Sequence, residues 1–80
     1  MQRGLTPAEV ADLEREGFFV REVVDIEPIR YAWRNFRTGA SQDDVKDRQP
    51  YRRSEAQAWA DCQKYTVGNY DNAPEPDWLD

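Results

Sequence analysis

The scarcity of cross-linking side chains is the strongest constraint on the fold of this chain. Its 80 residues include one cysteine, Cys62, and no histidine. The sequence therefore predicts neither an intrachain disulfide nor a structural zinc site, which needs about four ligands. A domain of this length buries only about 60% of the surface that its unfolded chain exposes. The core must come from large side chains, and the chain supplies three Trp, four Tyr and three Phe.

The first predicted element is a helix over residues 7–16. Thr6 is suited to cap its N-terminus, and Glu9, three residues later, completes a capping box. Gly17 can adopt the left-handed conformation that ends many helices. Leu13 lies on its narrow apolar face, so we expect the helix to pack on the rest of the domain.

Residues 18–36 show the apolar alternation of an antiparallel hairpin, with Pro28 in its turn. On the second strand, Tyr31 and Trp33 share one face. Arg30 and Arg34 take the other face, and Phe36 falls on the arginine side. The pattern predicts core aromatic rings beneath an outer face rich in arginine. In the first strand, Glu22 interrupts the apolar face, and we expect it to face Arg30 or Arg34 across the hairpin.

The segment between the hairpin and the next helix is polar. Residues 40–50 predict a mobile loop in which only Val45 could act as an anchor, with a short third strand near Gln49 to Arg52. A second helix is expected to begin after Ser54, with an apolar stripe that includes Trp59 and Cys62, and to end at Gly68.

These elements predict an α+β fold: helix, antiparallel β-hairpin, possible short third strand, helix and flexible acidic C-terminal tail. Residues 1–68 form the expected single domain, and residues 69–80 form the proline-containing tail. We expect both helices to pack on one face of the hairpin. The core is expected to contain Val10, Leu13, Phe18, Val20, Val24, Tyr31, Trp33, Trp59 and Cys62.

Charge is segregated along the chain. Residues 1–29 carry three arginines and seven acidic residues, residues 30–53 carry seven basic and three acidic residues, and residues 54–80 carry one lysine and six acidic residues. The net charges are therefore −4, +4 and −5. Two interpretations are open. The segments either neutralise one another inside the fold, or one of them presents a charged surface to a partner.

The leading functional hypothesis is a non-catalytic module that binds a host protein or a protein–nucleic acid complex through charge-complementary surfaces. The acidic tail also contains a Trp-Leu pair that suits a short binding motif, or alternatively folds back onto the domain's own core. The residues expected to contact a partner are charged or aromatic: Asp12, Glu16, Arg30, Arg34, Arg37, Arg48, Arg52, Arg53, Asp77 and Trp78.

Two other functions remain open. The chain could be a nucleic-acid-binding accessory protein that uses the arginine-rich segment 30–53, or a small structural or regulatory subunit that dimerises along a hairpin edge. The net charge of −5 disfavours general adhesion to nucleic acid or to an anionic membrane. The alternation that separates Tyr31 and Trp33 from Arg30 and Arg34 also argues against base stacking beside those arginines.

No catalytic activity, cofactor or metal is expected. Cys62 lies on the apolar stripe of the second helix, no histidine can activate it, and the neighbouring Asp61 raises rather than lowers a thiol pKa. The chain contains no GxGxxG, P-loop, HExxH or CxxC motif. Its polar N-terminus and short apolar runs predict neither a signal peptide nor a membrane span. A lone thiol suits the cytoplasm.

Residues 31–59 resemble short proteins carried by phages and mobile elements. The resemblance rests on Tyr31-Ala-Trp-Arg-Asn, the Thr38-Gly39 turn, Tyr51, and the segment from Ser54 to Trp59. It implies a hairpin that ends in a Thr-Gly turn, followed by a helix. Some proteins of this kind are anti-CRISPR or related anti-defence inhibitors, which act by occupying a nucleic-acid-binding surface of a host complex. The resemblance thus implies a bacterial host cytoplasm and an inhibitory role. The basic central segment departs from a uniformly acidic DNA mimic.

Overall fold

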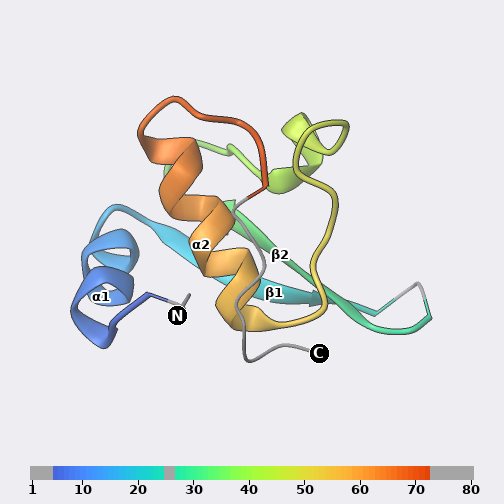
Figure 1. The fold of residues 1–80 in the computed structure, drawn as a ribbon. Coiled ribbons are helices and arrows are strands. Elements are labelled where there is room, and N and C mark those ends of the chain that lie inside the picture. The colour runs from blue at the N-terminus through green and yellow to red at the C-terminus, as the bar shows by residue number, and fades with distance from the viewer. Residues whose placement is uncertain (1–4, 25–26, 73–80) are drawn as a thin grey trace.

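The computed structural model describes residues 5–24 and 27–72 and confirms a small α+β fold. Its elements are α1 (Pro7–Arg15), β1 (Phe18–Val23), β2 (Arg30–Asn35), the 3-10 helix η1 (Gln42–Val45) and α2 (Glu55–Thr66). Figure 1 shows α2 lying across the hairpin of β1 and β2, with α1 beside the start of β1. The hairpin extends past α2 on the side away from α1 (Figure 1).

The predicted capping box of α1 is present. The Glu9 amide donates to the Thr6 hydroxyl at 3.2 Å, and the Thr6 amide donates to the Glu9 carboxylate at 2.8 Å. This bond to the Thr6 amide, followed by the bond from Gln63, holds the pKa of Glu9 below its ordinary value. The helix ends at Arg15, one residue earlier than predicted, because Glu16 serves as its C-cap.

Gly17 allows the chain to turn from α1 into β1. Its φ of 101° lies in the left-handed region, and a Cβ there would lie 2.8 Å from Cγ of Arg37 and 2.9 Å from Oδ1 of Asn35. Gly39 also has a positive φ, 78°, but a Cβ there would meet nothing within 4 Å. The two glycines therefore share a backbone requirement, whereas only Gly17 is closely packed.

We expect Gly17→Ala to lower the free energy of unfolding by about 2–3 kcal/mol, because backbone strain and crowding add together. Gly39→Ala is the matched control and should cost only about 1 kcal/mol, since strain alone applies there. Urea unfolding followed by circular dichroism measures both variants. Equal losses for the two would show that the contacts over Gly17 yield freely.

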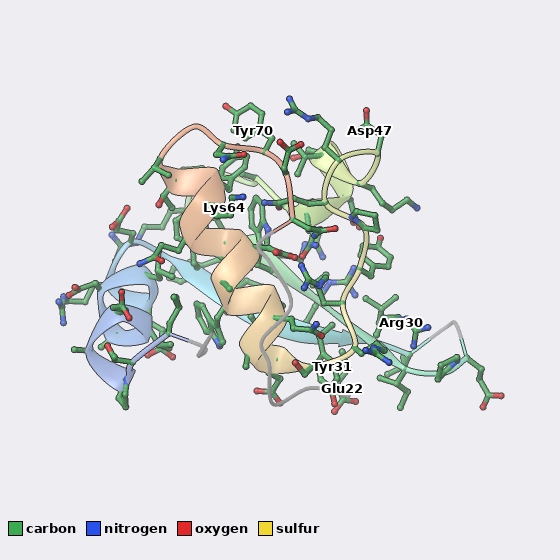
Figure 2. All side chains as sticks on the ribbon, viewed as in Figure 1. Glu22, Arg30, Tyr31, Asp47, Lys64 and Tyr70 are labelled. Carbon is green, nitrogen blue, oxygen red and sulfur yellow. The ribbon has the colours of Figure 1, made fainter. Side chains whose placement is uncertain are left out.

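The hairpin has a regular antiparallel register in which Phe18 pairs with Asn35 and Val23 with Arg30. Glu22 lies opposite Tyr31, and both side chains lie below the N-terminal end of α2 (Figure 2). The expectation that Glu22 faces an arginine across the hairpin is therefore wrong. The reason is parity: Glu22 shares the face of Tyr31, whereas the arginines of β2 point the other way.

The core lies between the inner face of the hairpin and both helices, as predicted. Leu13 of α1, Phe18, Trp33 and Cys62 of α2 form one buried cluster. Of the other expected core residues, four are only half-buried, namely Val10, Val20, Tyr31 and Trp59. The assignment of Val24 to the core is wrong, because it exposes 69% of its surface. Val24 follows β1 on the part of the hairpin that extends beyond α2.

The segment between β2 and α2 is anchored by two buried glutamines. Gln42 and Gln49 are both fully buried. The Gln42 amide group donates to the Gln49 carbonyl at 2.9 Å, and the Trp33 indole donates to Oε1 of Gln49 at 3.0 Å. The prediction that only Val45 anchors residues 40–50 is therefore wrong. Of the possible third strand, the structure shows a single bridge between Tyr31 and Arg52.

The Asp61 carboxylate of α2 accepts hydrogen bonds from polar side chains of this segment. It is fully buried and accepts from Arg52 at 2.8 Å, from Gln42 at 3.3 Å and from Asn72 at 2.7 Å. Burial of a charge is costly unless it is paired and hydrogen-bonded, and here three donors compensate it. The Asp61 carboxylate thus links the polar segment to α2, together with the Asp61 carbonyl, which accepts from the Gln49 amide group at 2.9 Å.

Candidate functional site

Exposed aromatic and arginine side chains gather on the outer face of the hairpin, opposite to α2. Phe19 lies directly across from Arg34. Phe36, whose amide donates to the Gly17 carbonyl at 3.0 Å, follows Arg34 on the same face. The guanidinium of Arg37 lies over the Phe36 ring, 5.7 Å from its centroid, which is within cation–π range. We call Phe19, Arg34, Phe36 and Arg37 the outer patch.

The outer patch is open to solvent. Phe36 exposes 69% of its surface and Phe19 exposes 37%, and both arginines are exposed. Within the described part of the chain, the Arg34 guanidinium makes neither a hydrogen bond nor an ion pair. Two rings and two positive charges are therefore available to a partner.

The outer face is closed next to this patch. Arg21 lies opposite Ala32, and its guanidinium approaches the Asp43 carboxylate at 3.7 Å on the far side of β2. The Tyr51 hydroxyl also donates to Asp43. Ala32 is only 1% exposed, as expected if the Arg21 side chain passes over it. The outer patch thus has a defined boundary toward the middle of the hairpin.

The structure separates the six arginines that the sequence predicts to contact a partner. Arg34 and Arg37 belong to the outer patch. Arg30 lies on the part of the hairpin that extends beyond α2 (Figure 2), where its guanidinium donates to the carbonyls of Pro28 and Ile29 at 3.3 and 3.4 Å.

The remaining three arginines lie elsewhere. Arg48 pairs with Asp71 at 2.9 Å. Arg52 is buried in its pair with Asp61, so it stabilises the fold and presents no charge to a partner. Arg53 is exposed just before α2. The six residues do not form one phosphate-binding surface.

The predicted acidic contacts are also divided. Asp12 is exposed and pairs with Arg15 within α1. Glu16 lies at the end of α1, where it lines a pocket. Asp77 and Trp78 lie outside the described residues.

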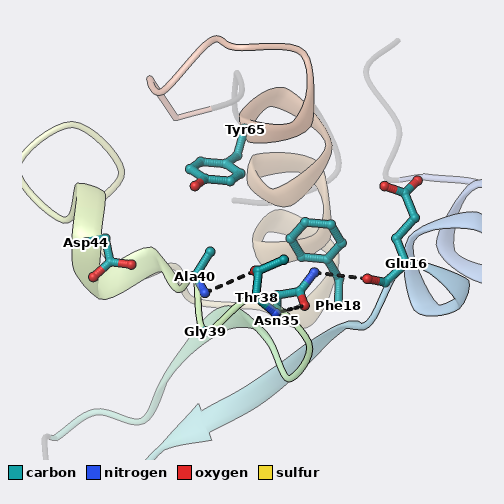
Figure 3. Close-up of a pocket in the computed structure, with 8 residues that line it drawn as sticks. All are labelled: Glu16, Phe18, Asn35, Thr38, Gly39, Ala40, Asp44 and Tyr65. Atoms are coloured by element: carbon teal, nitrogen blue, oxygen red, sulfur yellow. Dashed lines mark hydrogen bonds between the residues drawn. The ribbon is translucent and has the colours of Figure 1, made fainter.

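This pocket has a volume of about 560 Å³ and lies between the end of α1, the turn after β2, η1 and α2 (Figure 3). Its lining comprises two acidic, two aromatic and two neutral polar residues with two small ones: Glu16, Asp44, Phe18, Tyr65, Asn35, Thr38, Gly39 and Ala40. The Asn35 side chain connects two parts of the pocket lining by hydrogen bonds. The Asn35 amide group donates to the Glu16 carbonyl at 3.1 Å, and its oxygen accepts from the amide of Thr38 at 3.0 Å.

The pKa values of two groups, one in the pocket wall and one behind it, are raised above their ordinary values. Burial raises the pKa of Tyr65, and Tyr70 and the Asp44 carboxylate raise it further. Burial raises the pKa of the Cys62 thiol well above its usual range, with smaller contributions from Glu16 and Asp61. Cys62 is fully buried and protonated at neutral pH, which confirms the buried thiol expected from the sequence.

Sequence reasoning placed Phe36 on the arginine face but included neither Phe19 nor Phe36 among the residues expected to contact a partner. It singled out Tyr31 and Trp33 as the aromatic residues beside the arginines and placed them correctly on the inner face. The exposed rings are instead Phe19 and Phe36. Their parity relative to Arg34 was the signal that could have identified them, because cross-strand pairing follows directly from the hairpin register.

The described residues contain no helix long and apolar enough to cross a bilayer. The same residues bring together no group of three or more side chains able to hold a metal ion. In comparisons with known proteins, the chain matches no protein-family model, no curated protein and no solved structure.

Proposed function

We propose that this chain is a non-catalytic protein-binding module that contacts its partner through the outer patch. The observation that carries the proposal is the contiguous exposure of Phe19 and Phe36 beside Arg34 and Arg37. Aromatic and arginine side chains supply most of the binding energy at protein interfaces. Phe19 and Arg34 lie on the paired strands and Phe36 and Arg37 in the turn directly after β2, so their backbone is already ordered before binding.

The partner surface that complements the patch is apolar at its centre and acidic at its rim. The resemblance of residues 31–59 to short phage proteins supports a host nucleic-acid-handling complex as this partner. Binding would then inhibit the complex by occupying one of its working surfaces. Asp12 and Glu14 on α1 are exposed and could meet a basic region of the same complex.

A second candidate function is binding of unpaired nucleic acid, because exposed phenylalanine rings on an arginine-bearing strand face also suit base stacking. The net charge of −5 opposes it. Binding of this kind loses affinity steeply as salt rises, which distinguishes the two candidates.

The test is capture from a lysate of the bacterial host, treated with nuclease, on the immobilised wild-type chain and on four variants. We expect Phe36→Ala and Arg34→Ala each to reduce affinity for the captured protein by tenfold or more, since hot-spot truncations cost about 2 kcal/mol. Val67→Ala and Lys46→Ala are the matched controls, because both side chains are exposed outside the patch.

The proposal predicts that capture survives nuclease treatment and that the controls bind like wild type. Equal binding by all five proteins would remove the outer patch from the interface. Loss of capture on nuclease treatment would instead favour the nucleic-acid function.

A further inference from the structure

We propose that the free edge of β1 pairs with the same edge of a second copy of this chain, so that two hairpins join into one continuous antiparallel sheet. The proposal goes beyond the outer patch, because it uses the backbone along the rim of the sheet instead of the side chains on its face. The evidence comes from the hydrogen bonds along the two edges of the hairpin and from the order of side chains along β1.

The outer edge of β2 is occupied by the segment that follows it. Tyr31 exchanges two backbone hydrogen bonds with Arg52, at 2.7 and 3.0 Å. The Trp33 amide donates to Oε1 of Gln42 at 3.3 Å. This edge of the hairpin is therefore closed to a further strand.

The edge of β1 has no such cover within the described part of the chain. Opposite residues of an antiparallel pair alternate between those that bond each other and those whose amides and carbonyls point outward. The backbone of Tyr31 points outward to Arg52. Its opposite residue, Glu22, therefore points outward on the other side, and so do Val20 and Phe18 at steps of two. No described residue bonds to the backbone of these three residues.

The sequence of β1 does little to discourage pairing at this edge. Open strand edges are commonly protected by proline, by lysine or by a bulge. The strand Phe18–Val23 contains neither residue type, and its register with β2 is regular. Its two charged residues, Arg21 and Glu22, have opposite signs. A two-stranded hairpin also gains stability when further strands join it.

One antiparallel register makes β1 complementary to itself. When two copies of Val20 lie opposite each other across a two-fold axis, Phe18 lies opposite Glu22 of the second copy, and all these residues are in hydrogen-bonding positions. On the outer face, Phe19 then lies opposite Arg21 of the second copy, and the axis repeats this contact. An aromatic ring beside a guanidinium is a favourable cross-strand pair.

The neighbouring registers bring like charges together. A shift of two residues in one direction places Arg21 opposite Arg21 of the second copy, and a shift in the other direction places Glu22 opposite Glu16. Like charges directly opposite each other destabilise a sheet. A shift of one residue would place side chains of the two copies on opposite faces. The edge thus specifies a single register for a second copy, and this selectivity is the reason for choosing that partner.

Sedimentation equilibrium of the purified chain over a concentration series tests the association, and we expect a reversible dimer. Glu22→Pro removes an outward amide from an exposed position without removing a hydrogen bond to β2. It should weaken dimerisation by about tenfold or more, because the symmetric dimer loses two hydrogen bonds. Glu22→Thr is the matched control. It keeps the amide and suits a strand, so it should dimerise at least as tightly as wild type.

Hydrogen exchange of the wild-type chain gives a second measurement that needs no variant. The amides of Val20 and Glu22 should exchange rapidly in dilute solution. They should exchange about tenfold more slowly when nine-tenths of the chains are dimeric, since only the monomer exposes them. The amides of Arg21 and Val23 face β2 and are the internal control, with protection at both concentrations.

Three results would overturn the proposal. A chain that stays monomeric up to about 1 mM would leave this edge to a strand from a different protein. Equal dimerisation by Glu22→Pro and Glu22→Thr, or exchange at Val20 that does not change with concentration, would place any dimer contact elsewhere. None of these measurements involves the captured host protein, so failure of the dimer and failure of the outer patch are distinguishable.

Discussion

Asp61→Ala is expected to lower the free energy of unfolding by about 3–5 kcal/mol, because it leaves the buried Arg52 guanidinium without the carboxylate at 2.8 Å. The same change removes the acceptor for Gln42 and Asn72. A chain of 80 residues has a total stability of roughly 4–12 kcal/mol. The loss is therefore a large fraction of the total stability, and the variant should unfold at a markedly lower urea concentration than wild type.

Urea unfolding of wild type and variant measures this loss. Asp43→Ala is the control, since its carboxylate is partly exposed and lies 3.7 Å from Arg21. It should cost less than about 1 kcal/mol. If Asp61→Ala does not fold, Asp61→Asn keeps an acceptor and the volume and should show an intermediate loss. A loss for Asp61→Asn no larger than that for Asp43→Ala would mean that the buried carboxylate does not organise the segment.

The secondary structure was predictable because its signals are local. Thr6 and Glu9 mark the start of α1, Gly17 marks its end, and the alternation after it specifies a hairpin. The burial of Trp33 followed from the same alternation. These features depend on neighbouring residues only, so the sequence alone was sufficient for them.

The buried polar segment was not predictable by the same means. Gln42 and Gln49 are polar and lie in a segment without apolar periodicity, so every local rule favours an exposed loop. They are buried because Trp33 and Asp61, distant in sequence, supply their hydrogen-bond partners. Charge counting left two interpretations open for a similar reason: Arg52, named among the residues expected to contact a partner, instead pairs with a buried carboxylate on α2, as neutralisation inside the fold requires.

The candidate sites were predictable in part. Strand alternation placed Arg34 on the outer face. The same rule places Phe19 on that face once the register is known. The pocket required tertiary structure, because Glu16, Asp44 and Tyr65 come from three different elements. In the sequence, Asp44 is one of several acidic residues in a polar stretch, and only its capping-box spacing from Ser41 distinguishes it from Asp43 and Asp47.

Trp33→Ala is expected to cost about 3–5 kcal/mol as well, because it removes a fully buried aromatic side chain from the centre of the core. The indole ring contacts Phe18 edge-on at 5.7 Å between centroids and Tyr65 at 4.4 Å. It also donates to Gln49 at 3.0 Å. Its removal should therefore loosen the core and the buried glutamine segment together.

Trp33→Phe separates the two contributions. Phenylalanine retains most of the ring packing but leaves Oε1 of Gln49 without its donor, which should cost about 1–3 kcal/mol. Hydrogen exchange adds a second measurement: in Trp33→Phe the amides of Gln49 and Arg48, which donate to the Val45 carbonyl, should lose protection before those of α2. Equal unfolding free energies for Trp33→Phe and Trp33→Ala would contradict the packing argument, since the loss would then come from the indole hydrogen bond alone.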